Sequence, residues 1–246
     1  AGWPQLNIQQ FFDSALAATT SSPSPPPFVW VLGKWSGSSV TQLATLDRKG
    51  ELAVVLQSVP VVSPSSVRII GTQDQVALFD SDGVTSIRCS GPQGKGCIIL
   101  PKKKAPIGQV NDLCLGPSNS TRYRSTSVIG FDLIQNIANS FIVFLATQSQ
   151  GLLQWESSTQ LLSKISLSVV NGDYLANQTL TSVAWSGSPL NELSIGSPLL
   201  LYRRRTVGTN AYNWYWNFIG NHIDYAPKGL HYHEDTLWIG DNVTVY

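Results

Sequence analysis

Two short motifs contain the residue types of a metal site. His231 and His233 lie two positions apart, so a strand would carry both imidazoles on one face, a spacing that metal sites use. Asp80, Asp82 and Gly83 match the first positions of a calcium loop. No later histidine follows the first motif, and the second lacks a third carboxylate and the distal glutamate. We therefore interpret the histidines as partly exposed residues beside a turn and the aspartates as part of a hairpin turn. We predict no metal and no cofactor.

Catalytic motifs are absent or incomplete in this chain. No G-x-S-x-G motif occurs, and the glycine-rich segment 91–96 has no Ser or Thr after its Lys, so it does not match a phosphate-binding loop. His222 and Asp224 could serve in acid–base chemistry, but nothing marks a nucleophile. Carboxylates are sparse, although two acids distant in sequence can still form a glycosidase pair. We predict that the protein is not an enzyme, and a glycoside-acting enzyme is the remaining catalytic alternative.

The most aromatic segment, residues 211–218, is the best candidate for ligand binding. In a strand, Trp214 and Trp216 share one face while Tyr215 takes the other. One set can join the core, and the other must then be covered by a partner, a sugar or a loop. Aromatic residues that carry a polar group are typical interface anchors. We predict binding by Tyr212, Trp214, Tyr215 and Trp216, and complete burial within the monomer is the alternative.

Two basic runs stand out, residues 102–104 and Arg203 to Arg205. Arginine binds anionic groups through two parallel hydrogen bonds. A sulfated glycan or a sialic acid is therefore a candidate ligand for both runs, and Arg203 and Arg205 are predicted binding residues. Solvated loop charges are the alternative interpretation of both runs.

The overall charge excludes some classes of partner. Charged residues make up 13% of the 246 residues, against about 25% in ordinary soluble domains. The formal net charge is +1, so no global field attracts the chain to nucleic acid or to an anionic membrane. No apolar run reaches the length of about 20 residues that a membrane span needs. We predict no nucleic-acid partner and no membrane insertion.

The cysteines and the glycosylation motifs bear on the cellular compartment. Of the three cysteines, Cys89 and Cys97 could meet across a hairpin, but three reduced thiols are the favoured interpretation. Asn119, Asn177 and Asn242 match the glycosylation acceptor pattern. They favour secretion, although chance matches are expected in a chain rich in Asn, Ser and Thr.

The pattern of apolar residues predicts an all-β fold, an antiparallel β-barrel or sandwich with short peripheral helices. The apolar run Phe141 to Ala146, a turn, and Leu152 to Trp155 predict a central hairpin. Residues 165–169 and 180–185 around Asn171-Gly172 predict a second one. Other strands are expected at residues 28–32, 40–46, 52–56, 67–70, 76–79, 84–89, 97–100, 199–203, 230–232 and 237–239. No fixed period of about 40 residues holds along the chain, so a β-propeller is a minor alternative.

Helices and connections complete the predicted organisation. Apolar residues recur with helical spacing from Ile8 to Leu16, and Asp132 can cap a short helix that ends near Asn139. The proline-rich residues 19–27 cannot continue a helix. Residues 189–198 are expected to form a turn-rich connection. We therefore predict an arm and Pro-rich tether over residues 1–27 and a single antiparallel β domain over residues 28–246.

This combination of an antiparallel β body, a Pro-rich tether, low charge and no methionine, which suggests a piece excised from a longer chain, resembles a viral surface projection. The chain is similar in overall style, from Pro23 to Tyr246, to the protruding (spike) domain of the capsid protein of a small non-enveloped RNA virus, and most of all to the astrovirus spike. The resemblance implies a compact β-barrel on the virion surface, a homodimer, attachment to a host-cell receptor that is a protein or a glycan, and recognition by neutralising antibodies. It has no diagnostic motif, so it assigns no receptor residues.

A secreted, lectin-like carbohydrate-binding module is the alternative to the viral spike. Such a module would use the same aromatic residues to stack on sugar. It would also carry glycan at Asn119, Asn177 or Asn242.

Overall fold

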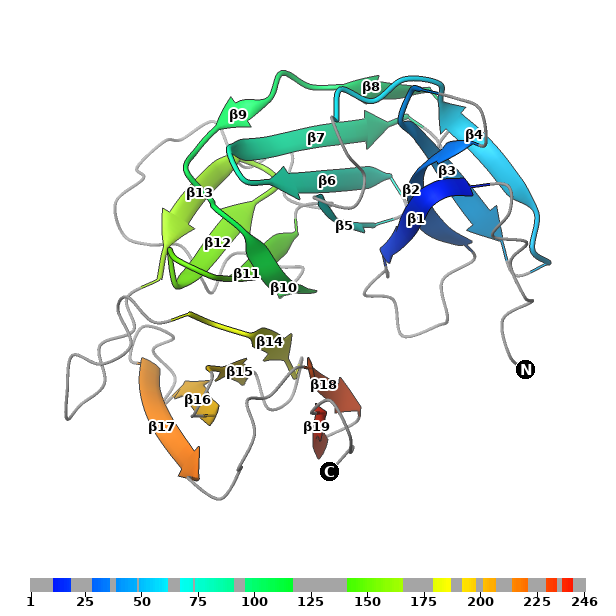
Figure 1. Cartoon of the computed structure of the whole chain (residues 1–246). Helices are drawn as coiled ribbons and strands as arrows, with labels where there is room; N and C mark the ends of the chain where they lie inside the picture. Colours follow the sequence, from blue (N-terminus) through cyan, green and yellow to red (C-terminus); the bar gives the residue numbers. More distant parts are fainter. Residues whose placement is uncertain are drawn as a thin grey trace. The chain divides into compact units, whose positions relative to one another are not determined.

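The computed structural model describes the chain as a series of antiparallel sheets (Figure 1). It describes residues 11–18, 28–35, 39–47, 49–61, 67–72, 74–90, 96–116, 141–165, 179–186, 192–197, 201–206, 214–220, 229–233 and 236–240. Within these ranges every regular element is a strand, and none is a helix. The all-β, antiparallel fold class predicted from the sequence is confirmed, whereas the predicted short helices are not found in the described residues.

Each sheet forms from strands that follow one another in the sequence. The first contains β1 (Phe11–Ala18), β2 (Phe28–Trp35), β3 (Gln42–Asp47) and β4 (Leu52–Leu56). The second contains β5 (Arg68–Gly71), β6 (Gln75–Asp80), β7 (Gly83–Cys89) and β8 (Cys97–Ile99), with β9 (Lys103–Lys104) on β7. The third contains β10 (Val110–Leu115), β11 (Ile142–Thr147), β12 (Leu152–Glu156) and β13 (Leu161–Lys164). The fourth contains β14 (Ser182–Trp185), β15 (Leu193–Gly196), β16 (Leu201–Thr206) and β17 (Trp214–Gly220), and a separate hairpin contains β18 (Gly229–His233) and β19 (Thr236–Gly240).

A four-stranded antiparallel sheet is the repeating unit of a β-propeller. Four sheets of this kind follow one another in the described residues of this chain. They begin at residues 11, 68, 110 and 182, so the intervals between them are unequal. The sequence shows no fixed period because the connections differ in length while the four-stranded sheets recur. The repeat is therefore one of backbone topology and not of residue pattern.

Local sequence accounts for the turns that join the strands. Between β3 and β4, an Asp47 carboxylate oxygen accepts the backbone N–H groups of Lys49 and Glu51, each at 2.8 Å. Gly50 follows with a φ of 83°, a conformation that glycine adopts at no steric cost. The central hairpin of β11 and β12 closes in the same manner through Thr147, whose hydroxyl donates to the Gly151 carbonyl at 2.7 Å. These two hairpins lie where the sequence predicts them.

The structure corrects two expectations about individual segments and leaves others outside the residues that it describes. Residues Phe11–Ala18 form a strand paired with β2, and not the predicted helix, because pairing with the edge of β2 outweighs the local helical spacing. The predicted connection over 189–198 contains strand β15, Leu193–Gly196, whose four residues are all buried. The predicted strand at 165–169, its Asn171-Gly172 turn and the helix that starts at Asp132 lie almost wholly outside the described residues.

The chain divides into two compact units, Ala1–Ile107 and Gly108–Tyr246. Strand β1 belongs to the first sheet. The predicted division into a tether over 1–27 and one domain over 28–246 stays a prediction. The described residues include no helix that is long and apolar enough to cross a membrane.

In the first unit, sheets β1–β4 and β5–β8 enclose an apolar core (Figure 1). Alternation along β2 places Phe28, Trp30 and Leu32 on one face, where they pack with residues of β5, β6 and β7. The Trp30 side chain is fully buried, its indole N–H donates to the Thr72 carbonyl at 2.7 Å, and its ring meets Phe28 edge to face. Trp30 therefore fixes the centre of this core.

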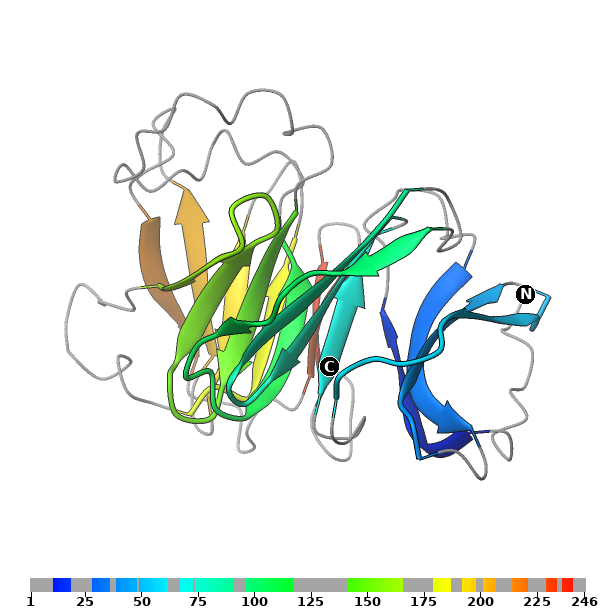
Figure 2. The ribbon, with the colours of Figure 1, turned by 90° about the horizontal axis from the view of Figure 1, so that it is seen from above.

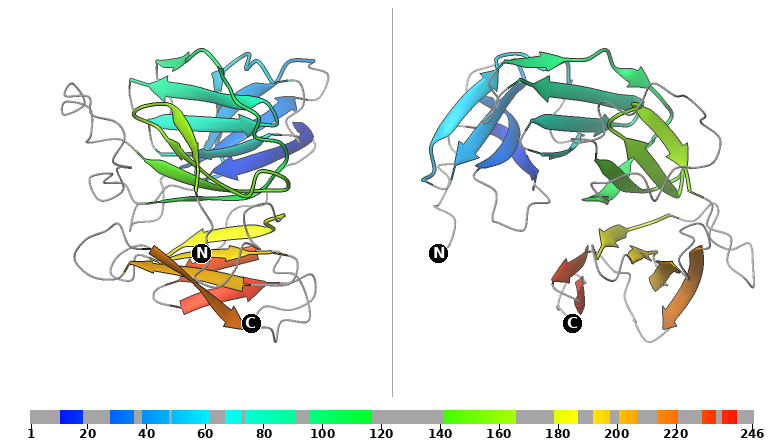
Figure 3. Two further views of the ribbon diagram at one scale, coloured as in Figure 1. Left: turned by 90° about the vertical axis from the view of Figure 1, so that its left-hand side faces the viewer. Right: turned by 180° about the vertical axis from the view of Figure 1, so that it is seen from behind.

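In the second unit, sheets β10–β13 and β14–β17 stand as adjacent layers (Figure 2). Their shared core contains Phe144 and Leu152 from one sheet and Val183, Leu193 and Ile195 from the other. The β18–β19 hairpin packs on the other side of β14, where Leu230 meets Ala184 (Figure 3). Sheet β14–β17 is therefore the middle layer of the second unit.

Candidate functional site

The two segments that the sequence singles out for binding are neighbouring strands. The arginine run lies in β16 and the aromatic segment in β17, and the two strands pair in antiparallel register. Arg205 is opposite Tyr215, and Arg204 is opposite Trp216. Tyr212 lies outside the described residues. The fold thus brings together two candidate groups that lie about ten residues apart in the sequence, through the ordinary geometry of a hairpin.

The register divides these residues between the two faces of the sheet. Residues directly opposite each other in a pair belong to the same face. Leu193 of the core is opposite Arg204 in the β15–β16 pair, and Arg204 is in turn opposite Trp216. Positions 204, 214 and 216 therefore belong to the face that carries the core of the second unit.

Arg203, Arg205, Tyr215 and Asn217 occupy the opposite face, and we call these four positions the Arg–Tyr face. Arg203 pairs with Ser194 on one side and with Asn217 on the other. The five predicted binding residues whose strands are described therefore divide by position between the two faces of the sheet. Trp214 and Trp216 fall on the core side, and Tyr215 falls with Arg203 and Arg205 on the other.

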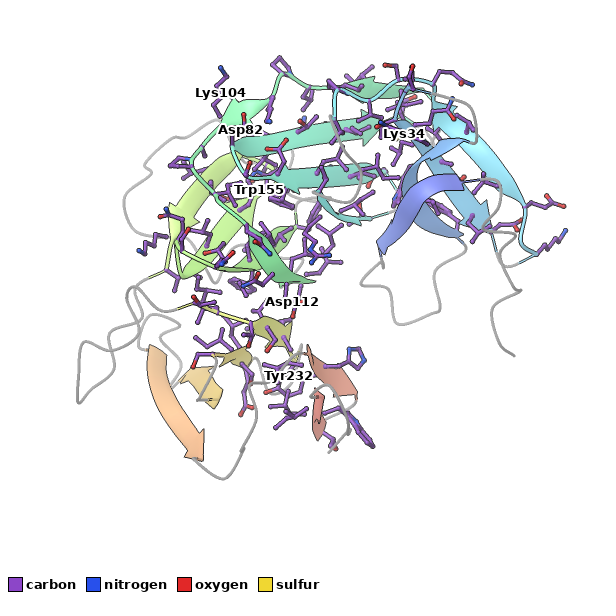
Figure 4. The ribbon with its side chains drawn as sticks, in the orientation of Figure 1. Lys34, Asp82, Lys104, Asp112, Trp155 and Tyr232 are labelled. Carbon is purple, nitrogen blue, oxygen red and sulfur yellow. A yellow bond between two sulfur atoms is a disulfide. The ribbon has the colours of Figure 1, made fainter. Side chains whose placement is uncertain are left out.

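A buried hydrogen-bond network lies on the same side of the sheet as the Arg–Tyr face. The Ser194 hydroxyl is 2.8 Å from the Tyr232 hydroxyl, which donates to a Glu192 carboxylate oxygen at 3.3 Å. Ser194 and Glu192 are both buried (Figure 4 labels Tyr232). The network joins Tyr232 of β18 to Ser194 of β15 and to Glu192, which directly precedes β15. Sequence reasoning missed these residues because strand β15 was not predicted.

A second polar connection joins the third sheet to the fourth. One Asp112 carboxylate oxygen accepts the Val183 backbone N–H at 2.9 Å, and the other accepts the Leu113 N–H at 2.9 Å (Figure 4). The neighbouring Asn111 amide donates to the Leu180 carbonyl at 2.7 Å. Both carboxylate oxygens of Asp112 therefore hold backbone groups in place, and its role is structural.

The Asp80 and Asp82 carboxylates share one cation. The Lys102 ammonium donates to Asp80 at 2.6 Å and also to Asp82. Gly83 completes this turn, and a Cβ at its position would collide with the Lys103 carbonyl, so glycine allows β9 to pair with β7. The hydrogen bond from Asp80, followed by the bond from Lys102, lowers the pKa of Asp82 to about 2. Burial raises the pKa of Asp80 above its ordinary value.

This arrangement confirms a hairpin turn and gives no support to a calcium loop. Lys102 supplies the positive charge that a metal would bring. The same contact removes one lysine from the basic run at 102–104, and Lys103 and Lys104 remain exposed (Figure 4). The described residues contain no cluster of three or more His, Cys, Asp or Glu side chains that could hold a metal ion.

The pair His231 and Trp238 lies on the outer side of the β18–β19 hairpin. The two residues are opposite each other in register, both are exposed, and 44% of the Trp238 side chain is accessible. Leu230 and Tyr232 alternate with His231 and face Ala184. The predicted partial exposure of His231 beside a turn therefore fits the structure.

The cysteines differ from the favoured expectation of three reduced thiols. Cys89 of β7 and Cys97 of β8 are opposite each other and form a disulfide. Cys114 is a free thiol. Burial, and then the negative charge of Asp112, raises the pKa of the Cys114 thiol well above its ordinary value, which disfavours the thiolate.

The comparisons with known proteins support the fold and leave the activity open. No protein-family model matches the chain, and no curated protein matches its sequence. The chain is similar to the solved structure of YjhT, a propeller-type protein, with a TM-score of 0.52 and 11% identity over 97% of this chain and 74% of that chain. At that identity the likeness shows the fold alone, which agrees with the succession of four-stranded meanders.

Two further solved structures are more distant. One is the Dos1 propeller, with a TM-score of 0.45 and 10% identity over 92% of this chain and 50% of that chain. The other is apo AztD from Citrobacter koseri, with a TM-score of 0.38 and 10% identity over 94% of this chain and 59% of that chain. Neither adds to the argument from topology.

Proposed function

We propose that the protein is a non-catalytic attachment module that binds carbohydrate through its Arg–Tyr face. The observation that carries this proposal is the register of β16 and β17, which places Tyr215 beside Arg203 and Arg205 on the face away from the core. A tyrosine ring offers a sugar both an apolar surface and a hydroxyl. Arginine donates paired hydrogen bonds to ligand oxygens.

Four of the described acidic residues have structural partners, which supports binding over chemical conversion. Asp80 and Asp82 are engaged by Lys102, and the Asp112 oxygens accept backbone N–H groups. Glu192 is buried and accepts a hydrogen bond from Tyr232. Glycoside hydrolysis needs two carboxyl groups that face each other across the bond to be broken. Each of these acids instead has a structural partner.

The disulfide bears on the compartment in which such a module works, and the edge strand bears on its oligomeric state. The Cys89–Cys97 disulfide supports an extracellular setting, as in the lectin-like alternative. The viral-spike hypothesis is the second candidate and predicts attachment to a host-cell receptor as a homodimer on the virion surface. What supports a homodimer is that β17 ends its sheet in the described part of the chain, since an edge strand can pair with a second copy.

An array of immobilised neutral and acidic oligosaccharides tests the proposal. We expect the protein to bind at least one oligosaccharide and to leave its mass unchanged after long incubation. Tyr215→Ala should weaken binding about 2- to 10-fold, the effect of losing a ring contact worth about 0.5–1.5 kcal/mol. Trp238→Ala, which removes an exposed ring from another hairpin, is the matched control and should bind as the unmodified protein does.

Two outcomes would overturn the proposal. Absence of binding to every oligosaccharide would remove carbohydrate attachment, and cleavage of a bound one would show an enzyme. Sedimentation of the same sample separates the two settings, because the spike hypothesis requires a dimer and the lectin-like one does not.

A further inference from the structure

We infer that the ligand of the Arg–Tyr face is an acidic sugar, one that carries a carboxylate or a sulfate. This inference rests on the proposed carbohydrate attachment and specifies its ligand class. It is drawn from the juxtaposition of Arg203, Arg205 and Tyr215 on two paired strands.

The spacing of the two arginine positions suits an anion on a sugar ring. Arg203 and Arg205 are two residues apart in a strand, which separates their backbone positions by about 7 Å on one face. Tyr215 is directly opposite Arg205 on the neighbouring strand. Arg203 and Tyr215 are therefore diagonal neighbours on the same face. A cationic and an aromatic residue in this arrangement suit a monosaccharide that presents an anionic group at one end and its ring face at the other.

The neighbouring positions identify Arg203 as the anion-binding residue. Its partners in register are Ser194 on β15 and Asn217 on β17, and neither is acidic. Arg205 lies one position beyond the last pair of the β15–β16 ladder, and its partner on β17 is Tyr215. We therefore assign the anionic group of the ligand to Arg203 and the sugar ring to Tyr215.

The positions of β14 and β15 on this side of the sheet are buried and are not part of the binding surface. They are Ser182, Ala184, Ser194 and Gly196, and the β18–β19 hairpin packs on Ala184 and Ser194. The proposed ligand surface is therefore confined to the positions of β16 and β17. The chain as a whole has few charged residues, so three arginines in one strand are a local concentration of positive charge.

The run of three arginines supplies its own matched control. Arg203→Gln and Arg204→Gln make the same chemical change one residue apart, on opposite faces of the same strand. The probes are heparin, which carries sulfates and carboxylates, fully desulfated heparin, a sialylated trisaccharide, and neutral maltohexaose. Affinities are measured by titration calorimetry at low and high NaCl, and melting temperatures are recorded for every variant.

We expect the unmodified protein to bind at least one acidic probe more tightly than maltohexaose and to weaken in high salt. Arg203→Gln should lower that affinity about 10-fold or more, the effect of losing a charge-assisted hydrogen bond. Arg204→Gln should stay within about 2-fold of the unmodified protein. Arg203→Lys keeps the charge without the planar fork and should fall between them. Preference for heparin over its desulfated form identifies a sulfate, and equal binding identifies a carboxylate.

The outcomes separate this inference from the proposed function. Binding of maltohexaose that equals binding of the acidic probes, with no effect of Arg203→Gln, overturns the acidic ligand and leaves carbohydrate attachment intact. Failure to bind any oligosaccharide overturns both. Equal losses in Arg203→Gln and Arg204→Gln overturn the assignment to this face. If Arg203→Gln lowers the melting temperature, the Arg203→Lys variant becomes the test of the acidic ligand. A folded Arg203→Lys variant that binds no acidic probe would contradict a role for the charge at this position.

Discussion

The two compact units of the chain hold their sheets together by different means. In the first unit the contact between sheets is apolar and centred on Trp30, and a disulfide closes the β7–β8 hairpin. In the second unit an apolar core is supplemented by side chains that bind the backbone or a side chain of a neighbouring sheet, as Asp112 does at Val183 and Tyr232 does at Ser194. The contact between sheets in the first unit therefore depends mainly on apolar volume, together with the hydrogen bond from the Trp30 indole to the Thr72 carbonyl. The second unit depends more on directed side-chain hydrogen bonds.

This difference accounts for the location of the candidate site. Directed bonds fix the register of neighbouring strands, because each donor must meet one acceptor. The β14–β17 sheet is held in this way along β14 and β15. Its other two strands, β16 and β17, carry the Arg–Tyr face. A binding surface gains precision when rigid elements support it.

The largest expected effect lies in the apolar core of the first unit. Trp30→Ala should lower the free energy of unfolding by about 3–5 kcal/mol, because it empties a fully buried site and leaves the Thr72 carbonyl without its donor. Trp238→Ala in the second unit, where the ring is 44% exposed, should change it by less than about 0.5 kcal/mol. Urea unfolding of both variants makes the comparison, and equal effects would contradict the burial described above.

Removal of the disulfide in the first unit should have the next largest effect on the free energy of unfolding. Cys89 and Cys97 are 8 residues apart, and removing a disulfide across so short a loop costs about 2.5 kcal/mol through the entropy of the unfolded chain. The double variant Cys89→Ser, Cys97→Ser should show this loss in urea. Alkylation of the folded, unmodified protein should label neither cysteine, and labelling of both would show that they are reduced.

Removal of a directed hydrogen bond in the second unit should lower the free energy of unfolding somewhat less than removal of the disulfide. Asp112→Ala removes the acceptor of the Val183 N–H and should lower the free energy of unfolding by about 2 kcal/mol. Asp112→Asn keeps one side-chain oxygen and should lose less. Hydrogen exchange at the Val183 amide provides the local measurement. An exchange rate unchanged in Asp112→Ala would mean that this bond does not secure the two sheets.

The smallest effect is expected at the exposed turn of the first unit. The folded pKa of Asp82 is lowered to about 2, so its contribution to stability is present above its ordinary pKa of 3.8 and is lost as the pH falls toward 2. Asp80 has the opposite sign, since a raised folded pKa favours the protonated form and reduces stability as the pH rises above 3.8. The two contributions oppose each other, so the pKa itself is the better observable. Lys102→Gln should raise the pKa of Asp82, measured by carbon NMR of the carboxyl group, and a constant value would show that Lys102 has no influence.

Much of the fold follows from local sequence where turn chemistry and alternation agree. The β3–β4 and β11–β12 hairpins lie as predicted because Asp47, Gly50 and Gly151 favour tight turns between apolar runs. Strand β15 was missed because its buried Ser194 and Gly196 give no strong strand signal. Strand β1 was mistaken for a helix because helical spacing is a local pattern, whereas pairing with β2 is a tertiary interaction.

The candidate site was predictable in composition but not in arrangement. The sequence identifies the arginine run and the aromatic segment as unusual. The register between β16 and β17 depends on the connection that joins them and on the β15–β16 pair, and no motif specifies either. A shift of one residue would exchange Arg203 for Arg204 and Tyr215 for Trp216 on the two faces. The division of the five residues therefore required coordinates.

The way in which strands pair has a consequence for synthesis of the protein in the cell. Every described pair joins strands that are consecutive along the chain, except that β9 pairs with β7. A nascent polypeptide can therefore complete one sheet before the segment for the next has left the ribosome, with little loop-closure entropy to overcome. Release of each finished meander in turn would shorten the time during which unpaired strand edges are exposed to other nascent chains.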